Sequence, residues 1–162
     1  MKQCERQRRK RAFTLIEAVV VIVALAVAVP PTLTWMDENV RQRADAVAIG
    51  RATVLATTVM ENILADTASA TAGLGINALA STAVWLDTPV TGLRARIAPV
   101  TSTYTAAGYS YDIQVGALVD STGVVNATPA MNIYRIVTVV VTFPTATGAS
   151  QSLRVSSMVT QL

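Results

Sequence analysis

The residue types that most often carry out catalysis or bind metals are scarce in this chain of 162 residues. It contains no histidine and a single cysteine, Cys4. A zinc site built from His and Cys, a Ser-His-Asp triad and a Cys-His pair are therefore excluded. Asp112 and Asp120 are candidates for a calcium site, but no loop of regularly spaced oxygen ligands surrounds them, so solvated surface acids are the preferred interpretation. Gly73 and Gly75 lack the lysine of a phosphate loop. The sequence thus predicts no enzyme, no cofactor and no metal site.

One acidic residue, Glu17, stands in a chemically unusual place. It interrupts the run Phe13–Val29, which is seventeen residues long and otherwise almost wholly apolar. As a helix this run spans roughly 25 Å, and about 35 Å if the helix continues to Met36, which is long enough to cross a bilayer. A charge in hydrocarbon is costly and usually functional. The partner of Glu17 therefore bears directly on what the protein does.

Positive charge is concentrated in front of the apolar run. Six of the thirteen Lys and Arg residues, including both lysines, fall within the first eleven positions, and the rest of the chain carries seven basic and nine acidic side chains. The net charge of +3 therefore comes from the leader and says nothing about nucleic-acid binding by the body of the protein, so no such binding is inferred. A basic run directly before an apolar segment marks the cytoplasmic side of a membrane insertion.

The residues at this junction carry a family resemblance. Arg11 and Ala12 are followed by Phe13-Thr-Leu-Ile-Glu17 and then by the apolar run. This pattern resembles the processing site of type IV pilins and type II secretion pseudopilins. The resemblance implies that a prepilin peptidase removes the leader 1–12 between Ala12 and Phe13, and that Phe13 is then N-methylated. The family usually has Gly before the cut, and Ala12 departs from it while keeping a small side chain.

Cleavage at Phe13 would create a cationic amine at the end of the apolar helix. In a fibre, that amine could pair with Glu17 of a neighbouring subunit, which gives each buried charge a partner and fixes the axial register. The alternative is that Glu17 reaches toward lipid headgroups near the membrane edge. The first thirty residues have two other interpretations. One is a secretory signal peptide, which is disfavoured because Pro30-Pro31 stands where a small-residue cleavage site should follow. The other is a plain membrane anchor, which leaves Glu17 unexplained.

Residues 13–65 are expected to be helical, as a membrane or fibre-core segment followed by an amphipathic stem. Pro30 and Pro31 predict either a kink or local melting near Ala26–Pro31, or an end at Val29 with a new helix after Pro31. Apolar residues recur at three- and four-residue steps along the stem and should face a covering domain. They are Met36, Val40, Ala44, Val47, Val54 or Leu55, Val59 and Ile63.

Residues 66–162 are expected to form a periplasmic, β-rich globular domain. It begins with a connection, Thr67–Ala83, which is rich in Ala, Thr, Ser and Gly and has a possible short helical turn near Ile76–Ser81. Leu93–Ile97 is predicted as a first strand ended by Pro99, and residues 109–115 alternate with period two. Residues 133–143 and 151–160 are expected to form a hairpin, with 133–143 as a central strand. The fold class is therefore α+β: a long N-terminal helix packed on an antiparallel sheet of three or four strands, similar to the pilin domain.

These features predict a structural fibre subunit, either of a type IV pilus or of a type II secretion pseudopilus. Its expected partners are the prepilin peptidase, other pilin or pseudopilin subunits, an inner-membrane assembly platform and the lipid bilayer. The subunit would span the bacterial inner membrane once, with its N-terminus cytoplasmic, before it joins a periplasmic or surface fibre. Cys4 would be lost with the leader, so the mature chain would contain no cysteine. Because major pilins of the family often carry a disulfide in their C-terminal region, the resemblance then favours a minor pilin or pseudopilin. The alternative is a membrane-anchored periplasmic binding domain that joins no fibre.

Overall fold

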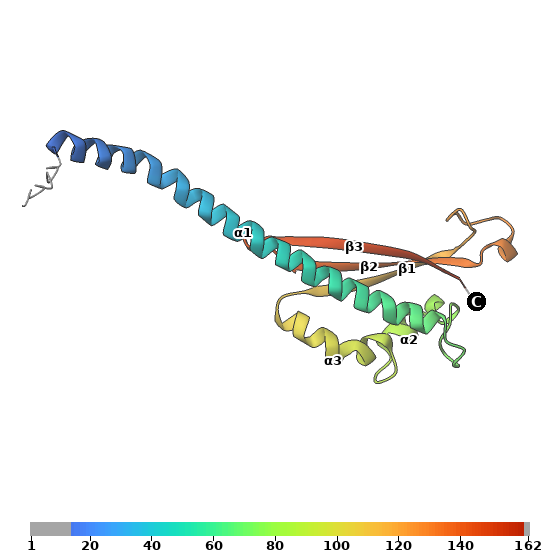
Figure 1. The fold of residues 1–162 in the computed structure, drawn as a ribbon. Coiled ribbons are helices and arrows are strands. Elements are labelled where there is room, and N and C mark those ends of the chain that lie inside the picture. Colours follow the sequence, from blue (N-terminus) through green and yellow to red (C-terminus); the bar gives the residue numbers. More distant parts are fainter. Residues whose placement is uncertain (1–13, 161–162) are drawn as a thin grey trace, which may run out of the picture. The chain divides into compact units, whose positions relative to one another are not determined.

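A computed structural model of the chain describes residues 14–160. The elements follow in the order α1 (Leu15–Thr67), the 3₁₀ turn η1 (Ala78–Ala80), α2 (Thr82–Asp87), α3 (Leu93–Ala106), β1 (Ser110–Val119), the 3₁₀ turn η2 (Pro129–Met131), β2 (Tyr134–Pro144) and β3 (Ser150–Thr160) (Figure 1). The chain divides into two compact units, residues 1–41 and 42–162. The fold class is α+β, with a long N-terminal helix and a three-stranded antiparallel sheet, as predicted.

In the first unit, α1 runs without interruption through Pro30 and Pro31. The predicted end at Val29 is therefore wrong. Two adjacent prolines remove two N–H donors from a helix of 53 residues, and the Ala, Val and Leu residues on both sides keep the remaining ladder intact. Next to the prolines, the Thr32 hydroxyl donates to the carbonyl of Val29 at 2.7 Å, a local bond that accompanies bent helices.

The second unit is organised around the sheet. Its strands lie in the order β1-β2-β3, so β2 is central, and every pairing is antiparallel. The predicted hairpin is confirmed, with Val139 opposite Val155. Its turn closes where Thr145 donates its N–H to Ala149 at 2.8 Å, and Gly148 supplies the positive φ that the turn requires.

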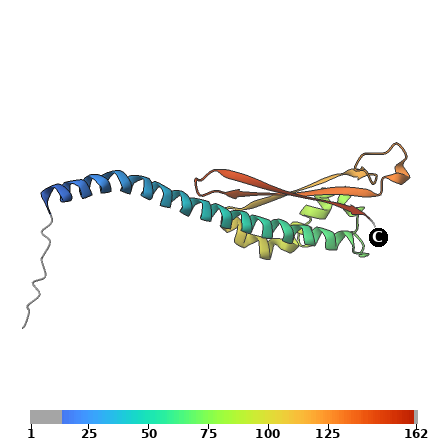
Figure 2. The ribbon, with the colours of Figure 1, turned by 45° about the horizontal axis from the view of Figure 1, so that its top comes forward.

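One face of the sheet carries the core. On β2 the buried apolar side chains are Val137, Val139, Val141 and Phe143, at alternate positions. The second half of α1 covers this face through Leu55, Val59 and Ile63, which are also buried, in agreement with the predicted stripe. The short helices lie beside α1 on the same side of the sheet (Figure 2). Near the middle of α1, the Asp45 carboxylate accepts the main-chain N–H of Ala146 at 2.6 Å and so links α1 to the hairpin turn.

The apolar stripe predicted along the stem was only partly correct. Val59 and Ile63 are fully buried, and of the alternatives Val54 and Leu55 it is Leu55 that is covered, with 1% exposed against 55% for Val54. Met36, Val40 and Val47 are exposed by 56% or more. The covering face instead uses small residues, Ala52 and Ala56, because their short side chains let the helix approach the sheet closely.

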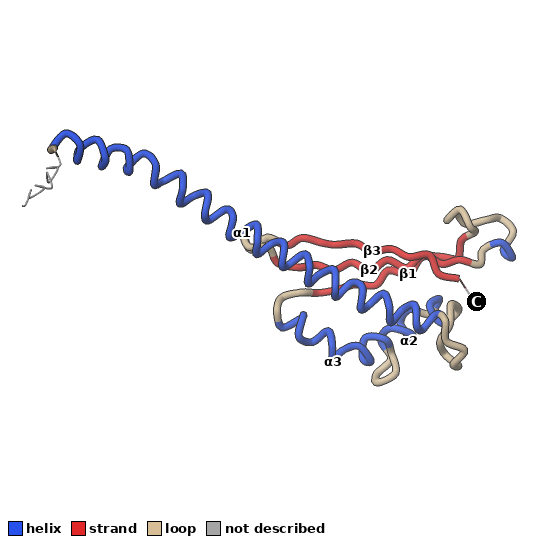
Figure 3. Tube along the Cα trace, viewed as in Figure 1, coloured by secondary structure: helices blue, strands red, loops and turns tan. Residues whose placement is uncertain are grey.

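The predicted first strand at Leu93–Ile97 is wrong, because this segment opens α3 (Figure 3). Leu93, Ile97 and Thr101 are buried at four-residue spacing, which is the helical period. Pro99 lies inside this helix rather than at the end of a strand. The helical turn expected near Ile76–Ser81 is present as η1, whereas α2 was not predicted.

Candidate functional site

The N-terminal turn of α1 has the sequence of a capping box and one of its two hydrogen bonds. Thr14 precedes the helix, and its hydroxyl accepts the N–H of Glu17, three residues later, at 3.3 Å. Ser or Thr at this position with Glu three residues on is a common signature of a helix start, and a carboxylate in the first turn is favoured by the helix dipole. Glu17 is exposed. The predicted cleavage position, between Ala12 and Phe13, lies outside the described residues.

The helix that follows presents an unburied apolar surface. Its most apolar 18-residue window has a mean hydropathy of 2.3, and none of that window is buried by the rest of the chain. Leu15, Ile22 and Val27 are exposed by 84%, 65% and 72%. By length and composition the helix could cross a membrane. A surface of this kind needs lipid or other apolar helices around it.

The structure does not bring the two candidate calcium ligands together. Asp112 lies on the exposed face of β1, with an Oδ1 atom 3.6 Å from Nη2 of Arg94. Asp120 instead organises its own loop, where it accepts the N–H and the hydroxyl of Thr122 at 2.8 and 2.6 Å and the amide of Asn126 at 3.1 Å. The hydrogen bonds from Thr122, and then from Asn126, lower the pKa of Asp120 to about 2. Within residues 14–160 no three His, Cys, Asp or Glu side chains group as metal ligands.

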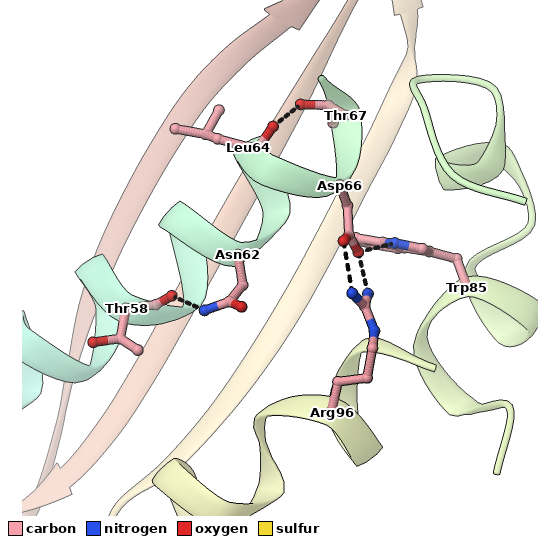
Figure 4. Close-up of polar contacts among 7 residues, drawn as sticks. All are labelled: Thr58, Asn62, Leu64, Asp66, Thr67, Trp85 and Arg96. Atoms are coloured by element: carbon pink, nitrogen blue, oxygen red, sulfur yellow. Dashed lines mark hydrogen bonds and ion pairs between the residues drawn. The ribbon is translucent and has the colours of Figure 1, made fainter. Parts of the chain in front are cut away.

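A polar cluster that the sequence did not reveal closes the C-terminal end of α1 (Figure 4). Asp66 is 3% exposed and accepts the indole N–H of Trp85 and Nη1 of Arg96, each at 2.8 Å. A second guanidinium nitrogen of Arg96 completes the ion pair. The hydrogen bond to Asp66 raises the pKa of Arg96. One signal was available, because Asp66 follows Val59 and Ile63 on the covered face, where an acid requires a buried partner.

Arg135 is a second buried charge, on the core face of β2. It is 7% exposed, and Nη1 donates to the carbonyl of Gly116 at 2.9 Å. That carbonyl is available because the register of β1 shifts between Val115 and Leu118. Burial lowers the pKa of the Arg135 guanidinium, and its Nε atom has no partner in the described part of the chain.

A helix long and apolar enough to cross a membrane, followed by a small α+β domain, is a pilin-like layout and indicates a membrane-anchored protein. Residues 7–29 match the model of the prokaryotic N-terminal methylation motif. The motif indicates a type IV pilin-like protein that is processed by a prepilin peptidase, consistent with the family of type IV pilins and pseudopilins. No curated protein and no solved structure matches the chain. The matched segment includes Ala12, Phe13 and Glu17, which are the positions predicted to serve in processing and assembly.

Proposed function

We propose that this protein is a structural subunit of a type IV pilus-like or type II secretion pseudopilus fibre. The observation that carries the proposal is the exposed carboxylate of Glu17 in the first turn of an unburied apolar helix, within the matched methylation motif. A structural role rather than a catalytic one follows from the same argument, since the motif serves processing and assembly.

The pairing of Glu17 with a neighbour's terminus is the central contact of the proposed fibre. Removal of the leader at Ala12 gives Phe13 a free α-amine, four residues before Glu17 in the same chain. When a neighbouring subunit brings its own amine to Glu17, both charges leave water with an opposite partner. An apolar contact alone can slide along the helix axis, whereas this pair holds one register.

The stem offers a second surface for the same partner. Val40, Val47 and Val54 follow one another at seven-residue spacing and are exposed by 65%, 56% and 55%. The protein's own sheet covers other positions of the helix, so this row of valines is unpartnered in the described chain. Seven-residue apolar spacing is the pattern by which parallel helices pack together. In the proposed fibre the row contacts the α1 helix of another subunit.

Assembly requires the subunit to leave the bilayer. The basic leader places the N-terminus in the cytoplasm and the domain in the periplasm. An apolar helix leaves lipid only if the fibre offers equivalent apolar packing, so an inner-membrane assembly platform and a growing bundle of subunits are the partners of this step.

Mass spectrometry of the N-terminus tests the proposal. We expect the protein isolated from cells to begin with N-methylated Phe13. Because both lysines belong to the leader, the mature chain then lacks lysine entirely, and an amine-reactive reagent could modify the terminus alone. The competing function is a single-pass anchor for a periplasmic binding domain, and a chain that keeps Met1 in cells producing an active peptidase would favour it.

A further inference from the structure

A cavity of about 500 Å³ lies beside α2. Its walls come from the connection after α1, from α2, from the turn between α2 and α3, and from Arg96 of α3. Pockets that bind small molecules usually have volumes of about 300–1,000 Å³. This cavity is therefore large enough for a compact organic ligand.

The polar cluster at Asp66 holds the cavity walls in place. Trp85 and Arg96 both line the cavity, and both bond to the Asp66 carboxylate. The main-chain carbonyl of Asp66 also accepts the N–H of Gly75 at 2.9 Å, which ties down the connection that forms the opposite wall. A site whose walls are fixed before binding loses little conformational entropy when a ligand arrives.

The lining offers hydrogen-bond donors and no acidic side chain. A guanidinium has five N–H donors, and Asp66 takes two of those of Arg96, so three remain. The side chain of Arg96 is 36% exposed and can be reached. Among residues 14–160, the N–H groups of Ala72, Gly73 and Val90, which also line the cavity, have no hydrogen-bond partner. The remaining wall is apolar and includes Leu74 and Val84.

Backbone strain at the rim is a separate observation. Val90 has a φ of 72°, and Thr91 donates its N–H back to Pro89 at 2.9 Å, which closes a γ-turn around it. A β-branched residue with positive φ is a true outlier, because its side chain crowds the main chain. Val90 is nevertheless 83% exposed, so core packing does not compensate for the strain. Strained residues of this kind are concentrated at ligand sites.

We propose that this cavity binds a small carboxylate with an apolar body. The apolar body would contact Leu74, Val84 and Trp85, and the carboxylate would accept hydrogen bonds from the free donors of Arg96 and from the main-chain N–H groups at the rim. Arg96 already shares its charge with Asp66, so directed hydrogen bonds, rather than net attraction, select the head group. This site is independent of fibre assembly and adds a ligand to the globular domain.

Fluorescence titration of the full-length protein in detergent tests the site. Trp35→Phe leaves Trp85 as the single tryptophan, in the wall of the cavity. The probes are 4-phenylbutyrate and its neutral amide, which share an apolar body. We expect saturable quenching of Trp85 by the carboxylate and at least tenfold weaker binding of the amide. Equal affinities for the two probes would overturn the assignment of a carboxylate ligand.

Three variants on the same Trp35→Phe background test whether the cavity is the binding site. Ala72→Phe places a ring at the lining and should abolish the saturable signal, whereas Ala127→Phe, at an exposed position outside the cavity, should leave it unchanged. Arg96→Lys keeps a cation for Asp66 but removes the guanidinium fork, and should weaken binding of the carboxylate more than that of the amide. Saturable binding that persists in Ala72→Phe, or no saturable binding by the unblocked protein, would overturn the proposal.

Discussion

Trp85 donates its indole N–H to Oδ2 of Asp66 over 2.8 Å, and this bond joins α2 to the last turn of α1. The same carboxylate holds Arg96 of α3, so one side chain connects three helices. Removing this carboxylate takes the acceptor from three N–H donors on two side chains, which costs more than the loss of a single exposed contact.

Asp66→Ala should therefore lower the free energy of unfolding of the domain by about 3 kcal/mol. Trp85 fluorescence during denaturant unfolding of the Trp35→Phe protein measures the change. Asp112→Ala is the matched control, because its ion pair with Arg94 joins side chains that are 60% and 43% exposed. Surface pairs of this type contribute less than about 1 kcal/mol. Equal effects of the two substitutions would contradict the role assigned to Asp66.

The two faces of the stem should respond differently to truncation. Leu55 and Val54 are adjacent in the chain, but Leu55 is 1% exposed and Val54 55% exposed. Leu55→Ala should cost about 3 kcal/mol of stability, whereas Val54→Ala should change it by no more than about 0.5 kcal/mol. Thermal or denaturant unfolding of the detergent-solubilised protein compares them.

The same pair of residues tests the proposed helix contact between subunits. Val54→Asp should leave the isolated subunit folded but reduce its incorporation into fibres, because a charge would then face the neighbouring helix. The ratio of sheared fibre to membrane-bound protein measures this effect. If Val54→Asp subunits enter fibres as wild type does, the valine row has no role in packing.

The sheet was predictable because its signals are local. Residues 133–143 form a mostly β-branched run that ends at Pro144, and Gly148 marks the turn before the alternating residues of 151–160. The segment from Leu93 to Ile97 was ambiguous, because apolar residues at 93, 95 and 97 fit a strand while 93 and 97 also fit a helix. Only the later positions Thr101 and Tyr104 favour the helix, and Pro99 suggested an end before them.

Local sequence signals also explain which candidate sites could be predicted and which could not. The methylation motif occupies one continuous segment, so the sequence alone predicted Glu17 and the cleavage position. The cluster at Asp66 joins residues 19 and 30 positions apart, and the cavity is lined by four segments. The folded chain brings these residues together, and no spacing rule in the sequence could have paired them.

Glu17→Gln should separate membrane insertion from assembly. The amide removes the charge at nearly constant size, so the helix still inserts, but a neighbour's amine would enter the fibre without a counter-charge. We expect incorporation into fibres to fall roughly tenfold or more, equivalent to about 1.4 kcal/mol, at normal membrane levels. Glu61→Gln, an exposed glutamate on the same helix, is the control. Normal recruitment of Glu17→Gln subunits would exclude the proposed pairing.

The loop around Asp120 should keep its structure until strongly acidic pH. Its hydrogen bonds lower the pKa of Asp120 to about 2 from the usual 3.8. Because the folded-state pKa is the lower one, the stabilising contribution is fully present above pH 3.8 and disappears as the pH falls toward 2. The amide proton of Thr122, followed by NMR, should titrate with a midpoint near pH 2. Asp120→Asn should remove that transition, and a wild-type midpoint near 4 would contradict the hydrogen bonding described.

The turn between α2 and α3 contains two neighbouring positions whose substitutions should act in opposite directions. Val90→Gly relieves a φ of 72°, and after allowance for the flexibility that glycine adds to the unfolded chain it should stabilise the domain by about 1 kcal/mol. Gly92→Ala places a Cβ atom 2.6 Å from the carbonyl oxygen of Thr88, which the main chain must move to accommodate, and should destabilise by about 3 kcal/mol. Thermal unfolding should show a rise of roughly 4–8 °C for the first and a larger fall for the second. A lower melting temperature for Val90→Gly would mean that this backbone conformation is not strained. Backbone strain at the rim of the cavity would then no longer support a ligand site there.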